Sequence, residues 1–423
     1  MHGSGIIRFF VIIAALSLLL DWYVFYGLRT LVADWPSRRW QLIVLGSFLV
    51  ISLGVTILFF AGLGSLRHAQ GMRPYHEWLL SLFLSFLISK IFFAIVLSLG
   101  DLGRFTVGLS QHLGKPLKAG ETYFPARRKF ISELAVLLAA IPFSSFFYAI
   151  FKGKYNYKLH RQTLYFDDLP EAFDGFTITQ LSDIHSGSFD NTAAVQRGID
   201  LANAQKSDLF VFTGDLVNNA AWEIEPYINH FKQLKAPFGQ FSILGNHDYG
   251  DYIQWDSEAE KDANLDRLKE NHAKMDFRLL LDENLTLQKN GQQITLIGVQ
   301  NWGQGFKQKG DLEKALRGVD GRAFKILLSH DPTHWEKIVK QHPTKIHLTL
   351  SGHTHGAQFG IEAAWLRWSP VQYRYPHWAG HAQYHGRHLY INRGFGFLAF
   401  SGRLGIWPEV TVITLKKGKA AQA

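Results

Sequence analysis

The sequence contains no cysteine, only three methionines and just 19% charged residues among its 423 positions. Without cysteine the chain has neither a disulfide framework nor a thiolate metal site, which excludes the zinc-finger classes. It also lacks a Walker-type phosphate loop, RNA-binding signatures and a concentrated basic helix, although its formal net charge is +9. These absences argue against a nucleic-acid partner and favour membrane lipids, because many of the basic residues flank apolar segments.

Long apolar runs are concentrated in the N-terminal third of the chain. Four stretches, at 6–28, 42–63, 78–99 and 130–151, each have about the 20 residues that cross a hydrocarbon core of roughly 30 Å as a helix. The first exceeds the apolar region of a cleaved signal peptide and has no Ala-x-Ala exit, so we interpret it as an anchor. Pro142 interrupts the fourth stretch, for which we predict a kinked membrane helix.

Polar residues follow five short, β-rich apolar runs in the rest of the chain. The runs and the groups that end them are FTITQLSDIH, LFVFTGD, FSILGNHD, KILLSHD and IHLTLSGHTH. Read as strands, all five deliver Asp, Asn or His from their C-terminal ends, the edge of an α/β sheet where sites form. Singly, each motif is weak evidence, since a strand-end histidine such as His330 is more often structural. The ordered set predicts one two-metal site with oxygen and imidazole ligands, suited to Mn, Fe, Zn or Mg.

From about Phe173 to Leu415 the sequence resembles the calcineurin-like metallophosphoesterases. Beyond the metal motifs, the stretches SPVQYRYPHWAGHAQYHGRHLYINRGFG and GIWPEVTVITL are similar to the membrane-associated bacterial branch of that family. The resemblance implies an α/β fold, a four-layer α/β/β/α sandwich preceded by an α-helical transmembrane region. We expect about four transmembrane helices in residues 1–151, a linker at 152–172 and the metallophosphoesterase domain at 173–423. Asn218 and Ala357 depart from the acidic residue and the glycine that are common at their positions.

The resemblance also implies which residues hold two divalent metal ions. One ion would be held by Asp183, His185 and His355, the other by Asn246, His330 and His353, with Asp215 bridging both. A bridging carboxylate suits two dications roughly 3.5 to 4 Å apart, close enough to share one water and lower its pKa. The metal-bridging hydroxide is the expected nucleophile, which would attack phosphorus in line.

Two residues of the third motif have expected catalytic roles. His247 lies outside the ligand set and would stabilise the transition state or protonate the departing alkoxide. Asp248 would orient the His247 ring, and a turn-capping carboxylate after Gly-Asn-His is the equally weighted alternative.

These features predict a membrane-anchored, metal-dependent phosphoric ester hydrolase. We expect it to cleave a phosphodiester or pyrophosphate bond in a lipid-linked substrate. Two other classes stay open: a non-catalytic metal-binding receptor or scaffold, and a transport or lipid-handling protein that the phosphoesterase domain regulates. The last class rests on Asp21 and Lys90, two charges inside the first and third spans that we predict to pair. The equally weighted alternative is that Lys90 snorkels and Asp21 lies nearer an interface.

The orientation in the membrane is predicted from one basic cluster. Arg127-Arg128-Lys129, directly before the fourth apolar stretch, resembles a twin-arginine export signal. This interpretation places the catalytic domain on the outer face of a bacterial inner membrane. An ordinary basic flank before a helix is the alternative.

The segment from Trp365 to Tyr390 is rich in aromatic and arginine side chains. Such residues favour the headgroup layer of a bilayer, so we expect the segment to recognise a lipid headgroup or to seat the domain on the membrane. A long structural loop packed by its own aromatics is the competing interpretation. The sequence leaves the substrate-binding residues and the oligomeric state open.

Overall fold

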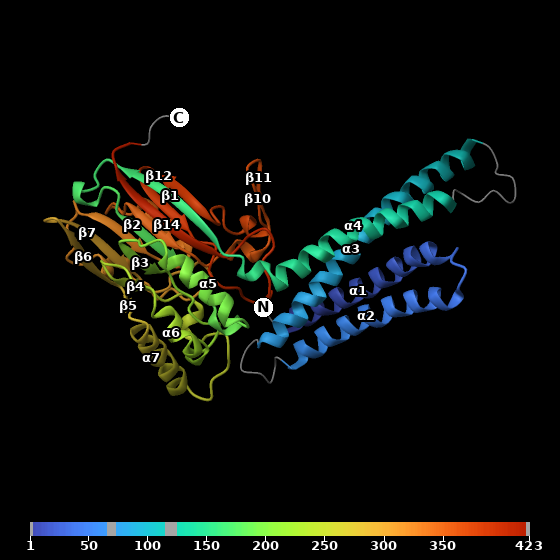
Figure 1. Ribbon diagram of the computed structural model, residues 1–423, viewed down its shortest axis with the longest axis horizontal. Helices are drawn as coiled ribbons and strands as arrows, with labels where there is room; N and C mark the ends of the chain where they lie inside the picture. The colour runs from blue at the N-terminus through green and yellow to red at the C-terminus, as the bar shows by residue number, and fades with distance from the viewer. Residues whose placement is uncertain (1–2, 66–72, 115–124, 420–423) are drawn as a thin grey trace. The chain divides into compact units, whose positions relative to one another are not determined.

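The computed structural model of the chain describes residues 3–65, 73–114 and 125–419 (Figure 1). The chain divides into two compact units, with the main boundary between Ala149 and Ile150. Long helices form the first unit, and the second contains all the strands found in the described residues. The apolar stretches and the strand-end motifs therefore belong to different units.

Four helices carry the apolar stretches: α1 (Gly3–Val32), α2 (Arg38–Ser65), α3 (Pro74–Gly114) and α4 (Pro125–Phe151). Each contains a membrane-length span of 24 to 30 residues with a mean hydropathy between 2.0 and 2.6. At most 33% of any such span is buried in the protein, so most of its side chains face outward, as lipid-facing residues do. Pro142 lies inside α4, and α3 continues well beyond the predicted end at Leu99.

A buried polar cluster joins three of these helices. Nζ of Lys90 on α3 donates to Oδ1 of Asp21 on α1 at 2.9 Å, and the two side chains are 5% and 4% exposed. The hydroxyls of Ser17 on α1 and Ser52 on α2 lie 2.9 and 3.1 Å from the same ammonium. The predicted pairing is confirmed, and the added hydroxyls satisfy the ammonium in a region without bulk water.

Two six-stranded sheets build the second unit (Figure 1). In spatial order the first sheet contains β1 (Lys158–Phe166), β14 (Glu409–Lys417), β2 (Thr177–Leu181), β3 (Leu209–Phe212), β4 (Gln240–Ser242) and β5 (Arg278–Leu279). The second contains β12 (Gly380–Tyr384), β13 (Arg387–Ile391), β9 (Leu348–Ser351), β8 (Phe324–Leu328), β7 (Gln292–Gly298) and β6 (Glu283–Lys289). The motif strands are parallel neighbours, β2 to β4 in one sheet and β8 with β9 in the other. Their C-terminal ends consequently meet along shared sheet edges.

Alternating side chains give each sheet two buried faces. Along β3, Val211 points into the core between the sheets, whereas Phe210 and Phe212 pack in a second core with α5 (Thr192–Asn203) and α7 (Glu258–Lys274). A third core joins the outer face of the second sheet to α8 (Leu312–Ala315) and α9 (Pro332–Lys337). The order helix, sheet, sheet, helix confirms the predicted α/β/β/α sandwich. The short helix α6 (Ile228–Phe231) and the hairpin of β10 (Ile361–Ala363) and β11 (Leu366–Trp368) complete the unit.

The segment 152–172, expected to be a linker, is largely part of the sandwich. Its strand β1 pairs in parallel with β14 over nine residues, and Leu164 and Phe166 are buried in the core between the sheets. Before that strand, Lys154 and Tyr155 both bind the carboxylate of Asp190, at 2.6 and 2.8 Å. The hydrogen bonds and apolar burial that this edge strand gains explain the difference.

Candidate metal centre

The predicted ligands leave their strands in a backbone conformation that is uncommon for residues with side chains. Five of them have positive φ, namely Asp183 (51°), His185 (46°), Asp215 (60°), His353 (72°) and His355 (50°). Left-handed backbone at such a residue costs about 1 to 3 kcal/mol and persists where the surrounding structure enforces it, typically at functional sites. The concentration of strain on these turns supports a functional role for them.

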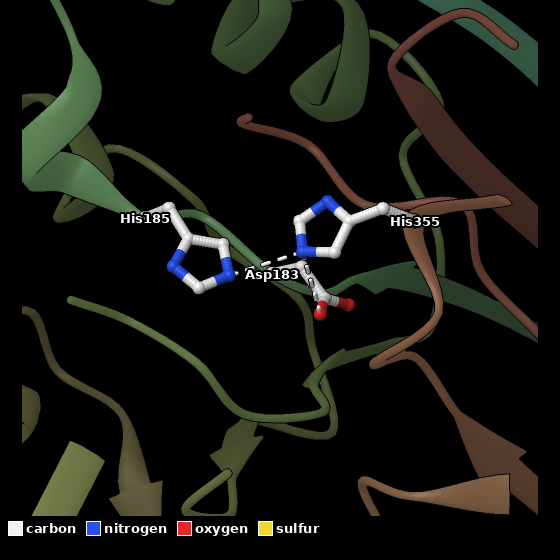
Figure 2. Close-up of side chains that lie close together, drawn as sticks. All are labelled: Asp183, His185 and His355. Carbon is white, nitrogen blue, oxygen red and sulfur yellow. Dashed lines mark hydrogen bonds and ion pairs between the residues drawn. The ribbon is translucent and has the colours of Figure 1, made fainter. Parts of the chain in front are cut away.

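Asp183, His185 and His355 form one group whose ligand atoms lie within 4.8 Å of one another. Figure 2 shows a ring nitrogen of each histidine turned toward the other, with the Asp183 carboxylate beside them. Nε2 of His185 lies 3.0 Å from Nε2 of His355, which lies 3.3 Å from Oδ1 of Asp183. Two imidazole nitrogens this close need a proton or a metal ion between them. The three predicted ligands of the first ion thus converge from β2 and β9.

Asp215, His330 and His353 form a second group with the same spacing. Oδ2 of Asp215 lies 3.1 Å from Nε2 of His330, and that nitrogen lies 3.3 Å from Nδ1 of His353. The same Asp215 oxygen is 3.6 Å from Nε2 of His185 in the first group. Asp215 therefore stands between the two groups, the position that a bridging carboxylate requires.

Asn246 is buried and follows the end of β4. Its Nδ2 donates to Oη of Tyr252 at 2.7 Å, whereas its Oδ1 has no hydrogen-bond partner among the described residues. The next residue, His247, donates its backbone N–H to Oδ1 of Asp215 at 2.8 Å. A buried amide oxygen without a hydrogen-bond partner costs free energy, because it has lost its hydrogen bonds to water. Coordination of a cation would offset this cost, so the Asn246 oxygen suits the role of a metal ligand.

The electrostatics of both groups favour divalent ions. Burial lowers the pKa of His353 to about 4 and that of His185 well below its usual range, so both rings are neutral, as metal ligands must be. Burial opposes the charge of Asp215, but the nearby His330 and His247 rings hold the pKa of this carboxyl well below its usual range. In return, the Asp215 carboxylate overcomes burial and raises the pKa of His330 to about 10, so a bound ion would have to displace the proton from this ring. Two carboxylates, an amide oxygen and imidazoles, without thiolate, fit Mn, Fe, Zn or Mg.

The predicted role of Asp248 needs a correction. Its Oδ2 accepts the backbone N–H groups of Asp215 and Gly245 at 2.9 and 2.8 Å, and its Oδ1 accepts that of Leu216 at 2.8 Å. The hydrogen-bond partner of the His247 ring is the carbonyl of Asn218, 2.7 Å from Nδ1. Asp248 therefore fixes the turn that carries Asp215, as the capping alternative proposed, because backbone donors already occupy its carboxylate.

Two other side chains support the site without being apparent from the motifs. Oη of Tyr375 lies 2.8 Å from Nε2 of His353, and Nη2 of the buried Arg403 lies 3.1 Å from Nδ1 of His355. Both residues follow GHTH in the chain: Tyr375 lies within the aromatic segment from Trp365 to Tyr390, and Arg403 comes after it. Nothing in the local sequence around Arg403 distinguishes it from a solvent-exposed arginine.

Glu223 supports the loop after Asp215. Its carboxylate accepts the backbone N–H groups of Asn218 at 2.6 Å and Asn219 at 3.1 Å. Burial raises the pKa of Glu223 to about 7 despite these hydrogen bonds. Because the same loop presents the Asn218 carbonyl to His247, Glu223 helps to position that ring.

Comparison with known proteins agrees with this geometry. Residues 176–357 match the calcineurin-like phosphoesterase family, and residues 7–154 match a family described as "Probable Calcineurin-like phosphoesterase, transmembrane domain". The uncharacterized metallophosphoesterase YkuE of Bacillus subtilis is 29% identical over 69% of this chain and 98% of its own length. A transmembrane protein with metallophosphoesterase domain from Danio rerio is 27% identical over 90% of this chain and 82% of its own length.

An α/β/β/α sandwich with two adjoining groups of oxygen and imidazole ligands, joined to apolar helices, defines a membrane-associated metallophosphoesterase. Residues 176–357 form a calcineurin-like phosphoesterase domain, and residues 7–154 match the four-helix transmembrane domain described with such phosphoesterases. The protein is therefore a metal-dependent phosphoric ester hydrolase.

Proposed function

We propose that the protein uses two divalent ions to hydrolyse a phosphodiester or pyrophosphate bond in a lipid-linked substrate. The observation that carries the two-ion proposal is the position of Asp215, whose Oδ2 lies within 3.6 Å of a histidine from each ligand group. The ligand sets we assign are Asp183, His185 and His355 for one ion and Asn246, His330 and His353 for the other, with Asp215 shared. When bound, the ions would supply an activated water and neutralise charge on the phosphoryl oxygens.

His247 is the residue that we assign to the substrate rather than to an ion. Since the Asn218 carbonyl accepts a hydrogen bond from Nδ1, the ring presents Nε2 for another partner. Tyr252 stacks on the ring with centroids 4.2 Å apart and limits its rotation. His247 is only partly buried, as is the ligand His353, whereas His185, His330 and His355 are buried. This position suits stabilising the transition state or protonating the departing alkoxide.

Membrane lipids are the partners that we propose, with no role for nucleic acid. The same chain holds four membrane-length helices and the catalytic unit, so a substrate in the bilayer stays close to the site. We further propose a bacterial inner membrane and an outward-facing catalytic unit, on the basis of the basic cluster before α4. Of that cluster, Lys129 forms an exposed ion pair with Asp34 at 3.0 Å, and the side chain of Arg127 lies outside the described residues.

The first test is hydrolysis of a chromogenic phosphodiester by purified protein after metal removal and separate addition of Mn²⁺, Zn²⁺ or Mg²⁺. We expect metal-dependent turnover in the wild type, its loss in Asp215→Ala, and wild-type turnover in the matched surface control Asp266→Ala, whose side chain is 70% exposed. Absence of turnover despite two bound ions per chain would contradict catalysis on diesters and favour a binding role. A lipid phosphodiester in vesicles then tests the substrate class.

Orientation needs its own measurement. Because the chain has no cysteine, a single cysteine at the exposed Trp222 reports the side on which the catalytic unit lies. We expect a membrane-impermeant maleimide to label Trp222→Cys in intact cells, and labelling only after lysis would refute the outward orientation.

A further inference from the structure

The β10–β11 hairpin has one charged and one apolar face. Glu362 and Arg367 are cross-strand partners on the charged face, and the largely buried Arg393 binds Glu362 at 2.6 and 2.8 Å. Since side chains alternate along a strand, the opposite face carries two other cross-strand pairs: Ile361 with Trp368 and Ala363 with Leu366. The charged face is therefore tied to the body of the unit, and the apolar face is directed away from it.

Large apolar side chains on and beside this hairpin are open to solvent. Trp365 at the turn is 82% exposed, Ile361 is 46% exposed, and Tyr373 shortly after β11 is 80% exposed. Exposed apolar side chains that gather on one element, instead of being scattered singly, are a feature of interaction surfaces. Trp and Tyr are the side chains that favour the layer between lipid headgroups and acyl chains.

The hairpin shares one supporting loop with Gly153, which follows the last membrane helix in the chain. The span of α4 ends at Phe151, and Gly153 packs against the backbone of Arg403 so closely that a Cβ there would lie 2.2 Å from its carbonyl oxygen. Two residues further along the same loop, Gly405 packs equally closely on the carbonyl of Gly360, directly before β10. Backbone contacts of this kind leave little freedom. The base of the hairpin is thus held close to Gly153, two residues along the chain from the end of the α4 span.

The segment after the hairpin also contacts the metal centre. Tyr375 contacts His353, and the carbonyl of Trp378 accepts the hydroxyl of Thr354 at 2.5 Å, between the two GHTH histidines. Arg403, in the loop below the hairpin, contacts His355. If the hairpin rests on a bilayer, these contacts therefore set the distance between the bilayer and the ligand groups.

We propose that the β10–β11 hairpin inserts Trp365 and Ile361 into the headgroup layer of the membrane that holds α1 to α4. Insertion buries the exposed apolar face and, together with the short connection from Phe151, fixes the metal centre at the bilayer surface. A phosphate group attached to a lipid would then reach the site without leaving the membrane. Only this last consequence rests on the proposed function.

The absence of cysteine allows a direct test with the full chain in vesicles of phosphatidylcholine and phosphatidylglycerol. A nitroxide is attached to Trp365→Cys and, in the matched control, to Trp222→Cys, an exposed tryptophan elsewhere in the same unit. We expect the label at 365 to collide more with oxygen and less with an aqueous nickel chelate than the label at 222. Equal exposure of both labels to the chelate would overturn the proposal.

The catalytic consequence has a separate readout. We expect Trp365→Ser to lower the rate on a lipid phosphodiester in vesicles and to leave the rate on a water-soluble diester unchanged. An unchanged rate on the lipid substrate would refute a role for seating in catalysis. If the wild type cleaves neither substrate, the proposed function fails, whereas the spin-label result still decides whether the hairpin enters the membrane.

Discussion

Gly352 lies between β9 and the ligand His353, where no side chain fits. A Cβ at this position would lie 1.9 Å from Oγ of Ser182 and 2.2 Å from Oδ2 of Asp183. Both neighbours are fully buried, so Gly352→Ala forces a displacement of roughly 1.2 to 1.5 Å before ordinary van der Waals contact returns. The carboxylate of Asp183 would move away from the backbone N–H of His353, to which its two oxygens are bonded at 2.9 and 3.0 Å.

The expected cost can be separated into stability and activity. Overpacking of a buried site costs about 1 to 3 kcal/mol of unfolding free energy. A misplacement of about 1 Å in a catalytic arrangement lowers turnover by roughly 10²-fold. Because Asp183 belongs to only one ligand group, we expect Gly352→Ala to lose affinity for one ion more than for the other.

The assay combines metal content per chain, phosphodiester turnover and thermal unfolding of the same preparation. Gly321→Ala is the matched control, since a Cβ there meets no atom within 4 Å. We expect Gly352→Ala to retain less metal and to lose most of its turnover while the control keeps both. Wild-type metal content and turnover in Gly352→Ala would refute the proposed ligand role of Asp183.

Three further predictions concern other parts of the molecule. Removing either charge of the buried Asp21–Lys90 pair should lower the free energy of unfolding by about 3 to 5 kcal/mol, measured as a lower melting temperature. Exchanging the two charges in a double variant should restore stability relative to each single exchange, and failure to do so would contradict the pairing. Glu223, whose pKa is raised from 4.5 to about 7, stabilises the fold fully below pH 4.5 and loses that contribution as the pH rises through 7. This is about 3 kcal/mol, so Glu223→Gln should flatten the melting temperature between pH 5 and 8, and a wild-type slope in the variant would be evidence against it. His247→Ala should lose about 10²- to 10⁴-fold in turnover with its metals retained, whereas His353→Ala should lose metal; intact turnover in His247→Ala would remove the acid role.

The membrane helices and most of the strands that carry the motifs can be predicted from short stretches of sequence, because hydropathy and side-chain alternation within each stretch specify them. Hydropathy over about 20 residues marks a membrane helix, since only that length crosses the hydrocarbon core. Alternation and β-branched residues mark the strands, and the positions of the polar groups after them follow from strand length. The strand at 158–166 was wrongly predicted as part of a linker, because the sequence of an edge strand with one half-exposed face resembles that of a polar linker.

The sequence by itself indicated the four apolar helices, the five strands that precede the motifs, the class of ligand that those strand ends carry and the resemblance that joins them. The tertiary structure decided which of these groups meet. It placed Asp215 between two ligand groups. It also made the Asn218 carbonyl, and not Asp248, the hydrogen-bond partner of the His247 ring, and it placed the Arg403 guanidinium in contact with His355. These contacts join residues from 29 to 115 positions apart, the longest being that of Asp215 with His330. Their partners depend on strand order and turn geometry, which no local pattern encodes.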